Sequence, residues 1–217
     1  MRSSRFFPRA LAAALVLLSA ACGPHQAVAQ GGSTPAAASQ DPTLPPAGFG
    51  SLRQDEIGVP LSLPTLRIRV IPLDERVIRM LSPDAYRSLH DMRESRADEI
   101  RALARSRGDS VAVFMVTFFG LQPQTRFSPD QLLISSQNAT YRPLGFVSIT
   151  PRFSENMVDA REQAAAIYVY EPGITVMRPF SVLYSGVQSD AWSDALDRLN
   201  TERSRVLSRA SAAQSRP

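Results

Sequence analysis

The chain has 217 residues, of which 44% are hydrophobic and 20% are charged. This composition allows a sizeable hydrophobic core and excludes disorder along the whole chain. One cysteine and two histidines exclude an internal disulfide framework, a CxxC redox pair and a cysteine-based zinc site. Every basic residue is an arginine, and the formal net charge of +4 raises the question of a nucleic-acid ligand.

The first residues predict a secretory signal peptide. Arg2, Arg5 and Arg9 precede an uninterrupted apolar run at residues 10–18, and this run is too short to span a bilayer. We therefore expect an extracytoplasmic protein. It would be a periplasmic or outer-membrane lipoprotein or, alternatively, a secreted soluble protein.

Two cleavage points remain open. The sequence LSAAC at residues 18–22 resembles a bacterial lipobox, which would make residues 1–21 the signal peptide and Cys22 the lipid attachment site. Ser19 stands where such motifs usually carry leucine. The alternative is cleavage after Ala29, behind an A-x-A sequence. If Cys22 is modified, its lipid would hold the protein at a membrane.

The charge of the exported chain argues against a nucleic-acid ligand. Removal of the leader takes away three arginines and leaves 21 arginines against 20 acidic residues. Nucleic-acid binding needs clustered cations that face phosphates, whereas the arginines at residues 91–94 and 96–101 stand beside acids. We expect no nucleic acid among the partners.

A linker is expected between the leader and the folded part. Residues 22–64 are rich in glycine, proline, alanine and serine. This composition buries little apolar area and predicts a disordered tether. A single folded domain is expected over residues 65–210, followed by a disordered tail at residues 211–217.

Strand and helix patterns follow one another at the start of this domain. Residues 66–70 alternate apolar and charged side chains, which predicts a strand with one buried face. A second short strand is predicted at residues 76–81. The sequence Ser82-Pro83-Asp84 is typical of a helix start, and helical spacing of apolar residues predicts an amphipathic helix over residues 83–107.

The region from residue 110 to residue 186 is rich in β-forming residues. Residues 111–119 are apolar on both faces, as in a central strand that is covered on two sides. Several short strands at this spacing favour an antiparallel sandwich over a parallel sheet. The further predicted elements are strands at residues 131–134, 141–150, 164–170 and 175–184, and a C-terminal helix at residues 189–210.

The long apolar strand is followed by the turn Phe127-Ser128-Pro129 and later by the step Tyr141-Arg142-Pro143. With these motifs, residues 110–186 resemble immunoglobulin-like modules of unknown function found on bacterial lipoproteins. The resemblance implies a mainly β fold: an immunoglobulin-like antiparallel β-sandwich with a flanking amphipathic helix and a C-terminal helix. It also implies a cell-envelope setting and a role in binding or assembly, and it brings no catalytic residues.

Ser88, His90 and Asp91 have the residue types of a hydrolase triad. On one helix, however, neighbours one or two positions apart do not face each other, and a triad needs converging side chains. We interpret His90 as a surface histidine.

Asp159, Arg161 and Glu162 bring two carboxylates close together in the sequence. Paired carboxylates can perform acid–base chemistry, but an exposed turn held by an Arg–carboxylate contact is the favoured interpretation. The sequence has no HExxH, Walker, G-x-G-x-x-G or G-x-S-x-G motif. We expect no cofactor and no metal.

Two hypotheses for function remain. The first is a non-catalytic envelope module that binds or assembles with an unidentified protein or polymer through a sheet edge, loops or a helix face. The second is an exported, glycan-directed hydrolase, which needs two carboxylates facing one cleft. The first is favoured, because the sequence supplies no catalytic set.

Overall fold

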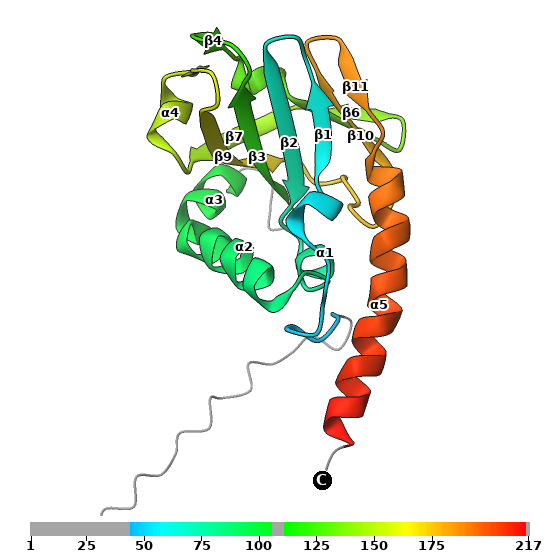
Figure 1. Ribbon diagram of the computed structural model, residues 1–217. Coiled ribbons are helices and arrows are strands. Elements are labelled where there is room, and N and C mark those ends of the chain that lie inside the picture. The colour runs from blue at the N-terminus through cyan, green and yellow to red at the C-terminus, as the bar shows by residue number, and fades with distance from the viewer. Residues whose placement is uncertain (1–43, 106–110, 216–217) are drawn as a thin grey trace, which may run out of the picture. The chain divides into compact units, whose positions relative to one another are not determined.

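The computed structural model describes residues 44–105 and 111–215 (Figure 1). These residues belong to one unit of the chain, which runs from Gln40 to Pro217. The predicted signal peptide at residues 1–21, the alternative cut after Ala29 and the lipid attachment site Cys22 lie outside the described residues, as does most of the predicted tether.

The larger sheet has five antiparallel strands. Along the sheet, each strand pairs with its neighbours in the order β1-β2-β3-β9-β7. Their bounds are β1 Val59–Ser62, β2 Leu66–Pro72, β3 Ala112–Gly120, β9 Gln163–Tyr170 and β7 Pro143–Ser148. The long apolar runs predicted as strands at residues 111–119 and 164–170 therefore form the centre of this sheet.

The smaller sheet is also antiparallel and has the order β11-β10-β5-β6. Its strands are β11 Val187–Ser189, β10 Phe180–Tyr184, β5 Leu133–Ser136 and β6 Ala139–Tyr141. A short ribbon pairs β4 (Thr125–Arg126) with β8 (Met157–Val158). The segment predicted as one strand over residues 141–150 is divided between β6 and β7, which belong to different sheets.

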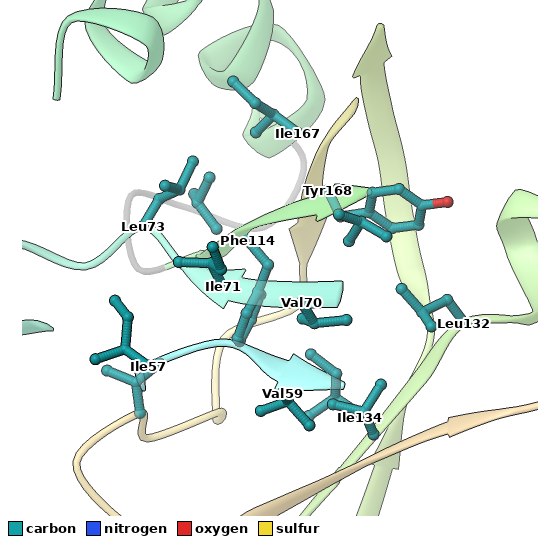
Figure 2. Packing of buried hydrophobic residues seen from close by; sticks show 14 of the residues in the cluster. Ile57, Val59, Val70, Ile71, Leu73, Phe114, Leu132, Ile134, Ile167 and Tyr168 are labelled. Atoms are coloured by element: carbon teal, nitrogen blue, oxygen red, sulfur yellow. The ribbon is translucent and has the colours of Figure 1, made fainter. Parts of the chain in front are cut away.

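The core lies where side chains of the two sheets meet. Phe114 of β3 contacts Phe180 of β10 edge to face, with ring centroids 5.7 Å apart. Phe118 contacts Tyr184 in the same way at 6.0 Å. The buried hydroxyl of Tyr170 donates a 3.0 Å hydrogen bond to a carbonyl oxygen before β5. Figure 2 shows buried side chains from both sheets in this core, among them Phe114 of β3 and Ile134 of β5.

Helices lie against the outer face of the larger sheet (Figure 1). α2 spans Pro83–Ser95 and α3 spans Ala97–Ala104, so the predicted helix over residues 83–107 is interrupted at Arg96, whose φ of −114° is not helical. Leu103 of α3 packs so closely on Gly145 of β7 that a methyl group there would come within 2.7 Å of it. The remaining short helices are η1 Gln54–Glu56, η2 Pro129–Gln131 and α4 Pro151–Ser154.

The predicted strand at residues 76–81 is wrong, because α1 occupies Glu75–Ile78. The Asp74 side chain caps this helix by accepting a hydrogen bond from the backbone N–H of Arg76 at 2.8 Å. Such an N-cap satisfies a backbone donor that the first helical turn leaves free. Val77 and Ile78 are both completely buried in this helix, and their hydrophobicity alone does not distinguish a strand from a helix.

The C-terminal helix α5 spans Trp192–Gln214. It begins three residues later than predicted and continues past residue 210, so a disordered tail is wrong for residues 211–214. The predicted strand at 175–184 is shorter because residues before β10 form a turn in which the Arg178 N–H bonds the Thr175 carbonyl. α5 runs along one side of the sheets and continues beyond them (Figure 1).

The tether predicted for residues 22–64 is wrong for residues 44–64, which are part of the domain. Ile57, Val59 and Leu61 are buried, and Ser51 lies against α5. The buried carboxylate of Glu202 accepts hydrogen bonds from the N–H and hydroxyl of Ser51 at 2.9 and 2.8 Å and from Arg209 at 2.7 Å. Burial raises the pKa of Glu202, but these hydrogen bonds outweigh it and hold the pKa below the usual value.

Antiparallel β-sheets with a C-terminal helix therefore organise the described residues, as predicted, although helices occupy a similar share of them. Among residues 44–105 and 111–215, no helix combines the length and the apolar character that a membrane span requires.

Candidate binding surface

The outer face of the five-stranded sheet is covered over only part of its length. Ile71 on β2 and Ile167 on β9 are fully buried there, near the α2–α3 pair. Further along the same strands, Thr117 and Phe119 of β3 are only half-buried and Arg67 of β2 is exposed. The helices thus leave one end of this sheet face open.

Two rows of cross-strand neighbours form the open part. Residues directly opposite each other in an antiparallel pair share one face of the sheet. Arg67 lies opposite Phe119 and Phe119 opposite Gln163, while Arg69 lies opposite Thr117 and Thr117 opposite Ala165. Here we call this surface the outer groove. Its volume is about 470 Å³, and its lining is Gln54, Arg67, Arg69, Met115, Thr117, Phe119, Ile149, Thr150, Gln163 and Ala165.

The two arginines of the outer groove are not engaged by the protein. Neither guanidinium makes an ion pair or a hydrogen bond with a residue in the described part of the chain. Arg76, Arg79 and Arg152 are, in contrast, each held by a carboxylate at 2.6 to 2.8 Å. The sequence predicts arginines with acids nearby, and Arg67 and Arg69 depart from that prediction.

This arrangement suits a ligand that is both acidic and apolar. A guanidinium binds a carboxylate through two parallel hydrogen bonds and is hydrated more weakly than an ammonium group. Met115, Phe119 and Ile149 provide an apolar floor next to the charges. No acidic side chain is among the lining residues, so the positive charge is uncompensated within the outer groove.

A second cluster of titratable groups lies between α1 and α2. It is centred on Glu75. The Glu75 carboxylate accepts from Arg79 Nε at 2.6 Å and from the Tyr86 hydroxyl at 3.2 Å, and it lies 2.8 Å from His90 Nδ1. Burial raises the pKa of Glu75, but Arg79 and His90 outweigh it and lower the pKa. A carboxylate held ionised by three partners joins two helices and is a poor proton donor.

The structure does not bring Ser88, His90 and Asp91 together as a triad. His90 turns towards Glu75, and its side chain is 36% exposed, while Ser88 and Asp91 are exposed. The interpretation of His90 as a surface histidine holds in part, because its Nδ1 contacts Glu75 and its ring packs against that of Tyr86.

The charge group at residues 159–162 stabilises a turn. Glu162 pairs with Arg152 at 3.2 Å, and the Asp159 carboxylate accepts a 2.8 Å hydrogen bond from the Gln124 N–H. The predicted Arg–carboxylate contact is present, but its arginine is Arg152 of α4 instead of Arg161. Both carboxylates are used in holding loops together, so no observation favours the glycan-directed hydrolase.

Among the described residues, no group of three or more His, Cys, Asp or Glu side chains is placed to hold a metal ion. No protein-family model matches the chain, and no curated protein or solved structure matches it either. The assignment of the outer groove as a binding surface is therefore based on its geometry alone.

One pattern in the sequence is consistent with the outer groove. Residues 111–119 are apolar on both faces and were expected to be covered on both. Arg67 and Arg69 alternate with buried residues in the predicted neighbouring strand. If that strand pairs with residues 111–119, the two arginines lie beside apolar side chains. The sequence alone does not show which strands pair.

Proposed function

We propose that the protein is a non-catalytic binding module of the cell envelope and that the outer groove binds an acidic, apolar segment of a partner protein. The observation that carries this proposal is the pair of unengaged guanidinium groups, Arg67 and Arg69, above an apolar floor.

The chemistry of the outer groove favours a peptide over a nucleic acid or a membrane surface. Polyanion surfaces are bound by many clustered cations, whereas this groove presents two. Its apolar floor matches the side chains of an extended peptide, and the amides of Gln54 and Gln163 on its rim can bond a peptide backbone. Aspartate or glutamate next to aliphatic or aromatic residues is the expected motif.

Charge reversal at Arg67→Glu and Arg69→Glu should abolish binding of such peptides. Peptides selected from a random displayed library against the purified protein should be enriched in acidic residues beside apolar ones. Their affinity for the double variant should fall at least about 100-fold, since each hydrogen bond to a charged group contributes about 1.5–3 kcal/mol. Fluorescence anisotropy of labelled peptides gives this ratio.

Arg178→Glu is the matched control, because Arg178 is an exposed arginine on the loop before β10. It reverses one charge away from the outer groove, as each substitution of the double variant does within it, and should leave the affinity unchanged. Selected peptides without acidic residues, equal loss in the control, or retention of affinity in the double variant would contradict the proposal. Tighter binding to anionic lipid vesicles than to any selected peptide would identify a membrane surface as the ligand instead.

The envelope setting is also a proposal. It is supported by the leader pattern in the first 29 residues and by the resemblance of residues 110–186 to immunoglobulin-like modules on bacterial lipoproteins. We propose that the two antiparallel sheets correspond to the sandwich of such modules, with the smaller sheet β11-β10-β5-β6 facing the larger one. Lipid on Cys22 would hold the protein at a membrane.

Lipid attachment has a direct test. Cells that express the protein with a labelled fatty acid should yield labelled protein, and Cys22→Ser should remove the label, because the thiol is the acceptor. Ser19→Leu restores the residue usual at that place of the motif and should not reduce labelling. Label that survives in Cys22→Ser, or an N-terminus that begins at residue 30, would refute attachment at Cys22.

A further inference from the structure

An aromatic platform lies on the opposite face of the sheet from the outer groove. Phe146 of β7 is directly opposite Tyr168 of β9 and therefore shares the face that carries the core. Its ring is 41% exposed although it contacts Phe153 at 5.2 Å and Tyr168 at 5.6 Å between ring centroids. The two buried rings fix the orientation of an aromatic ring that faces solvent.

Polar side chains surround this exposed ring. A pocket of about 460 Å³ is lined by Pro129, Asp130, Phe146, Ser148, Phe153, Ser154 and Asn156. Asp130, Ser154 and Asn156 make no side-chain hydrogen bond or ion pair with a described residue. The Asp130 carboxylate comes from η2, and the Ser154 hydroxyl and Asn156 amide come from the segment that ends α4 and leads into β8; these groups line one pocket with the Phe146 ring. We call this site the Phe146 pocket.

A buried hydroxyl without a partner lies behind the Phe146 pocket. The Tyr168 ring packs against both aromatic walls, and its hydroxyl is buried without a hydrogen-bond partner among the described residues. Burial raises the pKa of Tyr168, and the neighbouring Tyr170, Tyr184 and Asp130, in decreasing order, add to that shift. Leaving such a donor unsatisfied costs about 1–3 kcal/mol of stability.

The geometry points to a neutral pyranose ring as the ligand of the Phe146 pocket. A sugar ring has an apolar C–H face, which packs on an aromatic ring, and a rim of hydroxyls, which donate to a carboxylate and exchange hydrogen bonds with an amide. Phe146 supplies the first contact, and Asp130 and Asn156 supply the second. The volume lies within the range of about 300–1,000 Å³ that small-molecule sites occupy.

Two other ligand classes fit less well. An anionic sugar would meet the unpaired carboxylate of Asp130, and no arginine or lysine is among the lining residues. A purely apolar ligand would leave Asp130, Ser154 and Asn156 desolvated without partners, which costs free energy. The site goes beyond the proposed peptide groove, because it uses different residues on the other sheet face and does not depend on it.

The test is binding of the purified protein to an array of immobilised neutral and acidic mono- and oligosaccharides, followed by saturation-transfer NMR on the bound glycans. At least one neutral glycan should bind, with its saturation strongest on ring C–H protons. Phe146→Ala and Asp130→Asn should each weaken binding about tenfold or more, as expected when an aromatic contact or a charged hydrogen bond is lost.

The controls are Leu207→Ala, which removes another exposed apolar side chain, and Asp84→Asn, which removes another exposed carboxylate. Both should leave glycan binding unchanged, and so should the double charge reversal in the outer groove. Thermal unfolding checks that each variant is folded; Asp130→Asn changes an exposed side chain and keeps the test valid if Phe146→Ala unfolds. Binding of no neutral glycan, stronger binding of acidic ones, or equal binding by wild type and Asp130→Asn would overturn the proposal.

Discussion

Trp192→Ala should lower the free energy of unfolding by about 3–5 kcal/mol, as large aromatic deletions in a core do. Trp192 is completely buried at the start of α5. Its ring stacks on Phe180 of β10 with centroids 4.9 Å apart, and its indole N–H donates a 2.8 Å hydrogen bond to the Val176 carbonyl. Alanine would leave a cavity beneath the helix and a buried carbonyl without its donor.

Urea unfolding followed by far-ultraviolet circular dichroism measures this loss. The chain has one tryptophan, so fluorescence reports on the packing of α5 in the wild type but cannot follow the variant. Leu207→Ala on the same helix is the control, because Leu207 is 48% exposed and its removal should cost less than about 1 kcal/mol. A loss below about 1 kcal/mol in Trp192→Ala would show that α5 is not anchored by this residue.

The strands at the centre of the larger sheet were predictable because their pattern is local. Residues 111–119, with Thr117 as the one polar residue, and residues 164–170 are apolar runs bounded by turn residues, and they form β3 and β9. The C-terminal helix was predictable from the helical spacing of Trp192, Leu199 and Val206, which are all buried. The strands are recognised by their length and their β-branched and aromatic residues, and the helix by its apolar period.

The wrong predictions concern segments whose composition or hydrophobicity suggests one structure while local contacts favour another. Prolines and glycines suggested a tether up to residue 64, yet Ile57, Val59 and Leu61 alternate as buried residues and form the start of the sheet. At residues 76–81 a side-chain cap from Asp74 decides for a helix. A short apolar run is compatible with a buried strand or with a buried helical turn, so hydrophobicity alone cannot separate them.

Both candidate binding sites depend on contacts that are distant in the sequence. Arg67 and Phe119 are neighbours only because β2 pairs with β3 in one register. The Phe146 pocket brings Asp130 of η2 together with Phe146 of β7 and with Asn156, which precedes β8. A shift of register by one residue would move every side chain to the other face, so neither site could be predicted before the pairing was known.

Gly50→Ala should destabilise the domain by about 3 kcal/mol, since overpacking against a rigid neighbour costs about 1–3 kcal/mol or more. A methyl group on Gly50 would come within 2.3 Å of the Leu81 carbonyl oxygen and of the Met80 backbone. Backbone atoms cannot rotate away as a side chain does. The neighbouring bond from the Leu52 N–H to the Met80 carbonyl, 3.1 Å long, holds the two segments together at this point.

Displacement of this segment should also change the pH dependence of stability. The pKa of Glu202 is lowered in the folded protein. Its ionised form therefore adds stability above the unfolded pKa of about 4.3, and this stability is lost as the pH falls through the folded value. Ser51, next to Gly50, gives Glu202 two of its hydrogen bonds. Their loss in Gly50→Ala raises the folded pKa and makes the acid-induced loss smaller.

Urea unfolding of Gly50→Ala at pH 7 and at a series of values down to pH 3 measures both effects. Gly58→Ala is the control: its methyl group would approach the flexible Arg69 side chain at 3.1 Å and the Gln54 carbonyl oxygen at 3.3 Å, and its cost should stay below about 1 kcal/mol. Equal stability of the two variants would mean that the segment before η1 moves away from Met80 and Leu81 with little loss of folding free energy. A lower stability of Gly50→Ala with an unchanged pH dependence would mean instead that Ser51 stays on Glu202 and that the strain is absorbed at Met80 and Leu81.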